Sequence, residues 1–515
     1  MGNNAVVNVG PEPLSFDEVV RVARYGAEVR LTDEAVAVMA SARTRVDELA
    51  ESPIPAYGVS TGFGALATRH IEPSLRARLQ RSLIRSHAAG SGPEVETEAV
   101  RALMLLRLRT LATGHTGVRP RTAEVLMSLL NAQITPVVHE YGSLGCSGDL
   151  APLSHVALTI MGEGVVRDAS GDLVDAPEAL KRAGIEPVEL AAKEGLALIN
   201  GTDGMLGMLI LAMDDLGRLF RTADVAAAMS VEALLGTDRV FAADLQALRP
   251  HPGQAASAAN LRALLKDSGI MDSHRDGTCT RVQDAYSLRC APQVAGAARD
   301  TLAHAAAVAA RELVSVIDNP VILADGRVES NGNFHGAPVG YVLDFLAIAV
   351  ADVASISERR TDRMLDVARS HGLPAFLADD PGVDSGHMIA QYTQASIVSE
   401  LKRLAVPASV DSIPSSAMQE DHVSMGWSAG RKLRRSVDGL TRVLAVEILT
   451  AARALDLRAP HRPAPATGAV VAALRQVVSG PGPDRFLAPE IESVVRLVAD
   501  NAVVAAAERV TGPLG

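Results

Sequence analysis

The sequence has little cysteine and no excess of basic residues, and both shortages exclude classes of protein. Cysteine occurs only as Cys146, Cys279 and Cys290 in 515 residues. Because the three are few and far apart, we expect neither a disulfide framework nor a cysteine-based metal site. Acidic residues outnumber basic ones and give a formal net charge of −11. Binding to nucleic acid or to anionic membranes needs a basic surface, so we expect neither partner.

Secretion and membrane signals are also missing from the sequence pattern. The residues after Met1 lack the charged stretch and apolar run of a secretory leader. Charged residues interrupt the alanine-rich stretches every few positions, so we expect no span of about 20 apolar residues that could cross a bilayer. The pattern predicts a cytoplasmic protein.

Aromatic residues are scarce, at 3% of the chain, whereas strong helix formers such as Ala, Leu, Arg and Glu dominate long stretches. Apolar residues recur every three or four positions over residues 294–316 and 340–369. Helices of this length usually pack side by side in a bundle. Ser15 and Thr32 have the sequence context of helix N-caps, and a last helix is expected over residues 489–509.

Strand signals are few, and we expect only short hairpins over residues 165–174 and 321–329. The predicted fold is therefore mainly α, with a long central helical bundle, a loop-rich N-terminal active-site region and minor β-hairpins. Within one fused unit, we expect an N-terminal domain (1–200), a central long-helix bundle (201–470) and a C-terminal helical segment packed on the bundle (471–515).

Two short motifs carry little weight. Residues 58–62 match the G-x-S-x-G pattern of serine hydrolases with Ser60 as nucleophile, but that motif requires a strand before it and a helix after it. Pro55 precedes the match and further glycines follow it, so we interpret it as a chance match in a flexible loop. Glu420, Asp421 and His422 could bind a metal, but adjacent residues point to different sides of a helix or strand. No metal site is expected.

The segment from Gly142 to Pro152 reads Gly-Ser-Leu-Gly-Cys-Ser-Gly-Asp-Leu-Ala-Pro and suits an unusual backbone reaction. The amide nitrogen of Gly148, unhindered by a Cβ atom, can attack the carbonyl carbon of Cys146 and close a five-membered ring. Ser147 can then lose its hydroxyl group as water, which leaves an exocyclic methylene. The segment resembles the one from which aromatic amino acid ammonia-lyases form their methylidene-imidazolone prosthetic group. That family usually has Ala where this chain has Cys146, whose side chain takes no part in ring closure.

Other segments resemble the same family, in the same order along almost the whole chain. They are residues 57–64, 86–90, 200–202, 283–290, 331–336, 385–391 and 419–425. The resemblance implies a fumarase/aspartase-like helical architecture. It also implies a homotetramer whose active sites are shared between subunits, and an electrophile formed autocatalytically from Cys146-Ser147-Gly148 with no external cofactor.

The resemblance further implies which substrate is used. His87 and Glu420 match the residues that hold the substrate ring in family members acting on histidine, and a carboxylate suits an imidazole N–H. A charged or polar pair would be unfavourable beside a bare phenyl ring. The expected reaction is the non-oxidative deamination of L-histidine to trans-urocanate and ammonia.

Roles of single residues follow from the same resemblance. Tyr57 would be the catalytic base, although a tyrosine needs nearby positive charge or hydrogen bonds to lower its pKa for that role. Arg289 would hold the substrate carboxylate in a bidentate pair. The remaining residues expected at the site, which contact the substrate or the prosthetic group or line the pocket, are Asn200, Gln283, Tyr286, Phe334 and Met388.

Alternatives remain open at this stage. A tyrosine or phenylalanine ammonia-lyase, or an aminomutase of the same fold, would share most of these segments. A catalytically inactive helical scaffold is the alternative from another class, although nothing structural requires Ser147, Tyr57, Arg289 and Glu420 together.

Overall fold

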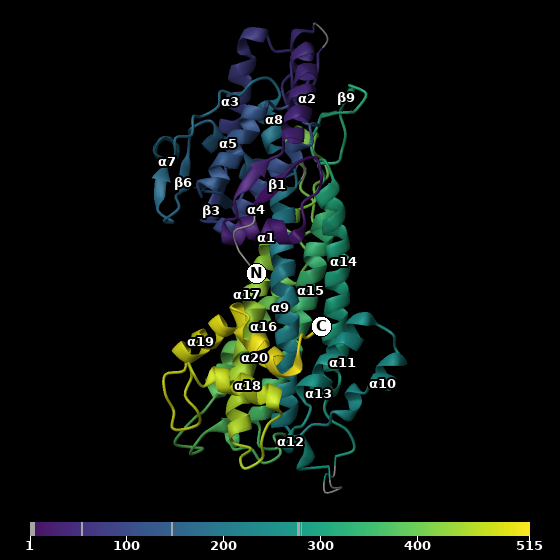
Figure 1. Cartoon of the computed structure of the whole chain (residues 1–515), viewed down its shortest axis with the longest axis vertical. Coiled ribbons are helices and arrows are strands. Elements are labelled where there is room, and N and C mark those ends of the chain that lie inside the picture. Colours follow the sequence, from purple (N-terminus) through teal and green to yellow (C-terminus); the bar gives the residue numbers. More distant parts are fainter. Residues whose placement is uncertain (1–5, 53–54, 146–147, 276–278, 280) are drawn as a thin grey trace. The chain divides into compact units, whose positions relative to one another are not determined.

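The computed structural model describes residues 6–52, 55–145, 148–275, 279 and 281–515, and the chain divides into two compact units (Figure 1). The first unit comprises Met1–Leu211, Ala306–Asp344 and Pro407–Arg431. The second comprises Ala212–Ala305, Phe345–Val406 and Lys432–Gly515. Each unit draws on three stretches of chain, whereas the expected parts 1–200, 201–470 and 471–515 follow chain order and remain a prediction.

The first unit contains most of the short elements. Its helices are α1 (Phe16–Tyr25), α2 (Asp33–Glu51), α3 (Arg76–His87), α4 (Thr97–Ala112), α5 (Pro120–Asn131), α6 (Leu150–Ile160), α7 (Ala176–Ala183) and α8 (Glu194–Ile199). Its strands are β1 (Val7–Val9), β2 (Val29–Leu31), β3 (Ser91–Glu94), β4 (Thr135–Pro136), β5 (His139–Tyr141), β6 (Val165–Arg167), β7 (Leu173–Asp175), β8 (Val321–Ile322) and β9 (Val328–Glu329). The α4 helix is buried along almost its whole length and forms the centre of this unit.

The strands pair in small sheets. β6 pairs antiparallel with β7, and β8 pairs antiparallel with β9, which confirms both expected hairpins. β4 adds to the edge of β6, and β3 pairs with β5. β1 and β2 pair in parallel, with Val7 opposite Val29. That pairing was not expected, because three-residue strands leave too short a pattern in the sequence to recognise.

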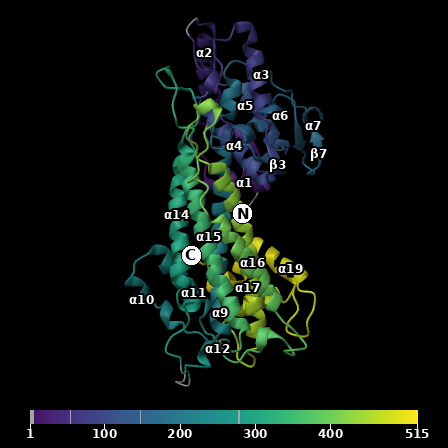
Figure 2. The same ribbon diagram turned by 180° about the vertical axis from the view of Figure 1, so that it is seen from behind.

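The second unit is a helical bundle. Long stretches of α9 (Asp203–Ala233), α14 (Ala291–Val314), α15 (Ala337–Leu365) and α17 (Gly426–Asp456) lie side by side in it, next to α16 (Met388–Leu404) (Figures 1 and 2). Its shorter helices are α10 (Ala243–Ala247), α11 (Pro252–Leu264), α12 (Gly269–Asp272), α13 (Tyr286–Arg289), α18 (Pro465–Leu474), α19 (Ala488–Ala499) and α20 (Ala502–Thr511). The prediction of a mainly α fold with a long helical bundle is confirmed, and α14 and α15 begin and end a few residues from the expected bounds.

Helix ends follow the sequence signals in two cases and depart from them in a third. Ser15 and Glu18 form a reciprocal capping box, and the Thr32 hydroxyl accepts from the amide of Ala35. The expected single helix over residues 489–509 is wrong, because the chain forms α19 and α20 with a break between them. Asn501 adopts a left-handed conformation with φ of 59°, which a continuous helix does not allow.

Two helical stretches in the described part of the chain are long and apolar enough to cross a membrane, Glu194–Ala233 and Ala337–Leu365. The expectation that no such span exists is therefore wrong. The apolar window is 100% buried in the first stretch and 61% buried in the second. Helices that are apolar on nearly all sides are also typical of the core of a bundle, which accounts for these two.

A buried carboxylate joins three helices of the bundle. Glu447 on α17 accepts from the hydroxyl of Ser230 on α9 at 2.7 Å and from that of Ser357 on α15. The guanidinium of Arg360, also on α15, donates to both carboxylate oxygens. Arg360 and Glu447 are almost fully buried, so neither charge has water as an alternative partner.

We expect Glu447→Ala to destabilise the protein by about 3–5 kcal/mol, because it leaves the buried Arg360 guanidinium without its partner. The double variant Arg360→Met/Glu447→Leu should recover most of that loss, since it removes both charges. Heat denaturation of wild type and both variants measures the effect. A midpoint for Glu447→Ala equal to that of wild type would show that the ion pair does not support the bundle.

Candidate functional site

The first unit contains a cavity of about 680 Å³. Four of the residues expected at the site from the sequence line it together: Tyr57, His87, Asn200 and Glu420. They come from stretches of chain up to several hundred residues apart, so the fold, rather than local sequence, brings them together. The walls between them are mainly apolar, and such a lining with a few polar groups is typical of a small-molecule site.

Tyr57 lies in the glycine-rich loop that precedes α3. Its ring packs edge-on against Phe63, with ring centroids 6.4 Å apart, and its hydroxyl accepts from the amide of Gly64 at 3.4 Å. Burial raises the pKa of Tyr57, the Gly64 amide lowers it, and the charges of Glu420 and Asp318 raise it further. The positive charge that a tyrosine base requires is therefore not supplied by these surroundings.

Ser60 follows in the same loop and has a structural role. It is fully buried, and its hydroxyl oxygen accepts from the amide of Ala56 at 2.9 Å. No strand precedes it among the residues described around this loop. The interpretation of the G-x-S-x-G match as a chance one agrees with this geometry.

His87 is the last residue of α3, and its tautomer can be inferred from its neighbours. The Ser86 hydroxyl lies 3.0 Å from the carbonyl oxygen of Leu83, to which it donates, and 3.0 Å from His87 Nδ1. The tautomer with a proton on Nδ1 satisfies both contacts, because the Ser86 hydroxyl then donates to Leu83 and accepts from Nδ1. Burial lowers the pKa of His87, while the Leu83 carbonyl and the Glu420 charge act against that shift. A neutral His87 therefore has Nε2 as a hydrogen-bond acceptor.

Glu420 is held by a tight turn. Ser415 and Glu420 exchange backbone hydrogen bonds, and the Ser415 hydroxyl donates to the Glu420 carboxylate at 2.9 Å. Between them, Ser416, Ala417 and Met418 all have positive φ angles of 50–70°. Consecutive left-handed residues other than glycine are rare and cluster at functional sites. This strained turn also carries Ser416, which lines the cavity.

Gly148 occupies a position that only glycine can fill. Its φ is +80°, and a Cβ atom added there would lie 2.0 Å from the carbonyl oxygen of Gly201. Next to it, the amide of Asp149 donates to the same Gly201 oxygen at 2.6 Å. Cys146 and Ser147 lie outside the described residues. The backbone on the C-terminal side of these two residues is thus packed directly against the start of α9.

The side chain of Asp149 adds further hydrogen bonds to the start of α9. Its carboxylate accepts from the amides of Gly204 and Met205 and from the hydroxyl of Ser143. Burial raises the pKa of Asp149 to about 7, against the opposing effect of these donors. On the N-terminal side, the Gly145 carbonyl accepts from the Ser424 hydroxyl at 2.9 Å. The segment around residues 146 and 147 is therefore anchored at both ends.

The other expected site residues lie elsewhere. Gln283, Tyr286, Arg289 and Met388 belong to the second unit, where the Arg289 guanidinium lies 4.7 Å from the centre of the Tyr286 ring. Tyr286 is 72% exposed. Phe334 is half-buried in the first unit and is not part of the cavity lining. No group of three or more possible metal ligands of the His, Cys, Asp and Glu types occurs in the part of the chain that the structure describes.

Several cavity residues were missed in the sequence. Ser86, Ser416 and Asn319 have polar groups at or beside the lining, and Arg69 contributes the only positive side chain among the described lining residues apart from His87. Ser86 lies within a segment that resembles the family, so its position beside His87 was a usable signal. Nothing local distinguishes Asn319 or Ser416 from ordinary loop residues.

The chain is similar to known proteins along almost its whole length. A family model described as aromatic amino acid lyase matches residues 14–476. A histidine ammonia-lyase of Streptomyces coelicolor is 66% identical over 99% of both chains, and one of Sorangium cellulosum is 50% identical over 98% of this chain and 99% of its own.

Among solved structures, a tyrosine aminomutase of Streptomyces globisporus matches with a TM-score of 0.93 and 39% identity over 99% of this chain and 100% of its own. A histidine ammonia-lyase of Trypanosoma cruzi matches with a TM-score of 0.90 and 38% identity over 99% and 96%. These similarities extend along the whole chain and confirm the fumarase/aspartase-like fold.

We expect Gly148→Ala to lower the heat-denaturation midpoint by several degrees, because the new Cβ atom collides with the Gly201 backbone. Gly171→Ala is the matched control, since Gly171 has a similar φ of +83° with no atom within 4 Å of its added Cβ. The control carries only the left-handed backbone penalty of about 1–2 kcal/mol. Equal midpoints for the two variants would show that the contact with residue 201 is unimportant.

Proposed function

Because this chain belongs to the aromatic amino acid lyase family, we propose that it deaminates L-histidine to trans-urocanate and ammonia. One observation carries the proposal: His87 and Glu420, a polar pair suited to an imidazole ring, line the same cavity as Tyr57 and Asn200. The curated relatives that are 65–66% identical over the chain are named histidine ammonia-lyases, which supports the same substrate.

Hydrogen-bond chemistry at the ring end of the cavity favours imidazole over phenyl. Nε2 of His87 and the carboxylate of Glu420 are both acceptors, so a ring with N–H groups satisfies them. A phenyl ring offers no N–H group to either acceptor, so it forgoes hydrogen bonds of about 0.5–1.5 kcal/mol, or about 1.5–3 kcal/mol to a charged group. The two acceptors together also favour a protonated substrate imidazole, which has two N–H donors.

The residues present fit a methylidene-imidazolone group formed from Cys146, Ser147 and Gly148. Gly148 lacks the Cβ atom that would hinder ring closure, and its surroundings leave no space for one. The buried Oδ1 of Asn200 lines the cavity and has no hydrogen-bond partner within the described part of the chain. Such a group supplies an electrophile that converts the substrate α-amine into a leaving group.

The chain's own residues would bind the substrate and move the proton. Tyr57 takes the β-proton of the substrate as general base. A bound substrate ammonium would lower the pKa of Tyr57 by opposite charge, against the effects of burial and Glu420. Arg289 holds the substrate carboxylate in a bidentate pair, and Tyr286, Gln283, Phe334 and Met388 complete the site.

We infer a homotetramer with shared active sites, because the resemblance to the family implies that assembly and Gln283, Tyr286, Arg289 and Met388 do not line the cavity described above. In the second unit, Phe345, Ile348, Ile389 and Tyr392 are each 46–59% exposed. Phe345 and Ile348 are three residues apart on α15, as are Ile389 and Tyr392 on α16, and neighbouring exposed apolar side chains are typical of surfaces that bind another protein. A second copy of the chain is the partner that the family resemblance implies.

We also propose that the enzyme is cytoplasmic, as the sequence pattern predicts.

The direct test incubates the purified chain with L-histidine, L-tyrosine and L-phenylalanine and follows the absorbance of the conjugated acrylate. We expect turnover of histidine far above the other two. Ser147→Ala should fold normally and release no ammonia, because the serine hydroxyl is the group lost in forming the electrophile. A tyrosine or phenylalanine preference would assign the protein to another reaction of the same fold. Turnover of histidine by Ser147→Ala at the wild-type rate would contradict the proposal that the prosthetic group forms.

We expect Glu420→Gln to lower kcat/KM for histidine by about 10–100-fold, since a hydrogen bond to a charged group contributes about 1.5–3 kcal/mol. Asp421→Asn is the matched control, because Asp421 is exposed and does not line the cavity. Steady-state kinetics with histidine measures both variants. Equal kcat/KM values for Glu420→Gln, the control and wild type would assign Glu420 to structure instead of substrate binding.

A further inference from the structure

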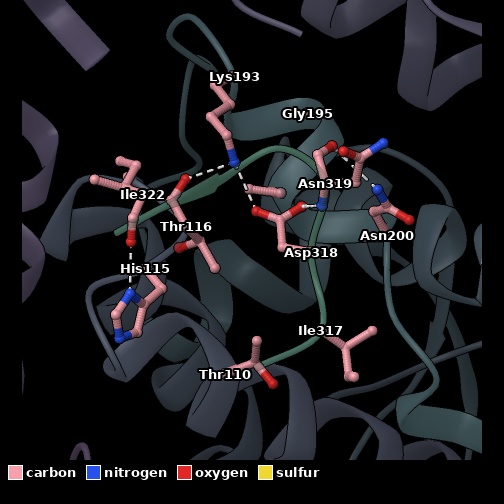
Figure 3. Close-up of polar contacts among 12 residues, drawn as sticks. Thr110, His115, Thr116, Lys193, Gly195, Asn200, Ile317, Asp318, Asn319 and Ile322 are labelled. Carbon is pink, nitrogen blue, oxygen red and sulfur yellow. Dashed lines mark hydrogen bonds and ion pairs between the residues drawn. The ribbon is translucent and has the colours of Figure 1, made fainter. Parts of the chain in front are cut away.

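A fully buried ion pair lies behind the part of the cavity wall formed by Asn200 and Asn319 (Figure 3). Lys193 Nζ lies 2.6 Å from Asp318 Oδ2, and both side chains are 0% exposed. Lys193 also donates to the carbonyl oxygen of Thr116 at 2.8 Å. All of these residues belong to the first unit. Neither charged group faces the cavity, so the pair cannot contact the substrate directly.

The orientation of the Asn200 amide depends on Asn319. Asn200 Nδ2 donates to the backbone carbonyl oxygen of Asn319 at 3.2 Å. Since the amide nitrogen is engaged there, the oxygen must point the other way, as Figure 3 shows. That Oδ1 atom is buried and unpartnered among the residues that the structure describes. A buried acceptor without a partner, at the lining of a cavity, is a position for a ligand donor.

Asp318 in turn fixes the position of Asn319. Its Oδ1 accepts from the backbone amide of Asn319 at 2.7 Å, while Oδ2 is held by Lys193. Asn331 closes the same turn, because its amide nitrogens bond to Asn319 Oδ1 and to the Asp318 carbonyl. The two oxygens of one carboxylate therefore connect the buried lysine to the residue that orients Asn200.

The ion pair also fixes the helix that ends at Asn200. Lys193 immediately precedes α8, with a φ of +68°, and Asn200 follows the last residue of that helix. Within α8, the amide of Gly195 donates to the buried Gln80 side chain on α3. Arg107 donates to the backbone carbonyl oxygens of Ala197 and Asn200. Both ends of this short helix are thus held by buried polar side chains.

Stability does not explain this arrangement. Taking two charges out of water is unfavourable, and replacing such a pair with apolar residues of similar volume is often neutral or stabilising. We propose that Lys193 and Asp318 are positioning residues, which fix Asn200 Oδ1 toward the cavity as the acceptor for the substrate amine. The inference rests on the proposed ammonia-lyase function and deepens it, since it assigns a role to two residues that do not contact the substrate.

Asp318→Asn is the first test. Its new amide group must face either the Lys193 ammonium or the Asn319 amide, both of which are donors, so one of the two contacts is lost. We expect kcat/KM for histidine to fall about 100-fold, the loss typical of a displacement of about 1 Å at a reacting centre. The intact mass should differ from wild type only by the substitution, which shows that the backbone segment is processed as before.

A double-variant cycle separates positioning from general support of the fold. If Asp318 acts through Asn200, Asp318→Asn should change kcat/KM by less than about 3-fold in an Asn200→Ala background. If the losses in kcat/KM caused by Asp318→Asn and by Asn200→Ala instead multiply in the double variant, the proposal is overturned. The apolar variant Lys193→Met/Asp318→Leu, which should fold with a midpoint close to that of wild type, is expected to lose activity to the same extent as Asp318→Asn. Full activity in this variant would overturn the proposal as well.

Asp224→Asn is the matched control in the second unit, because Asp224 is equally buried and pairs with Arg299 at 2.7 Å. It should retain kcat/KM within about 3-fold of wild type, and a loss there equal to that of Asp318→Asn would contradict a positioning role.

If the wild type does not convert histidine, the proposed function fails while the inference remains testable. Hydrogen exchange of the amides at residues 196–200 and 317–319 should then be faster in Asp318→Asn than in wild type, and unchanged exchange would overturn the inference.

Discussion

Buried charge must be paired or hydrogen-bonded, and this constraint shapes the cavity of the first unit. Two ion pairs lie behind its wall: Lys193 with Asp318, and Arg107 with Asp203 at 2.7 Å. Lys193, Asp318 and Arg107 also bond to backbone groups, which fixes the carbonyl and amide groups around them. The apolar helices supply the rigid surroundings in which such pairs keep their geometry. The polar end of a small-molecule site can therefore be held in place without any strand-rich framework.

Buried polar contacts also hold the chain on both sides of residues 146 and 147. Gly148 packs against the backbone of Gly201, and Asp149 bonds to the amides at the start of α9. The proposed reaction of this segment needs ends that do not move, and these contacts hold its C-terminal end against the first turn of α9. The expected contributions of Arg289 and Tyr286 come from the second unit. If the proposed homotetramer forms with shared active sites, assembly of several copies is part of the proposed chemistry.

Much of this could be predicted from the sequence. Periodicity predicted the long helices and turn residues predicted both hairpins, whereas the reactive segment around Ser147 remains a prediction. The break at Asn501 and the β1–β2 pairing were missed, since one left-handed residue and three-residue strands leave almost no pattern. The Lys193–Asp318 pair was also missed, because residues 125 positions apart meet only through the fold. Tyr57 was expected to need positive charge or hydrogen bonds to lower its pKa; burial and the charges of Glu420 and Asp318 raise that pKa, and the Gly64 amide alone lowers it among the contacts described.

The central claim is that the chain converts its own backbone into the electrophile, and the intact mass of the purified protein tests it most directly. Ring closure and dehydration each remove one water molecule, so the account predicts a mass two waters below that calculated from the sequence. Denaturation before the measurement would leave this deficit unchanged, because the modification is covalent. A mass equal to the calculated one, in a preparation that still converts histidine, would contradict the account.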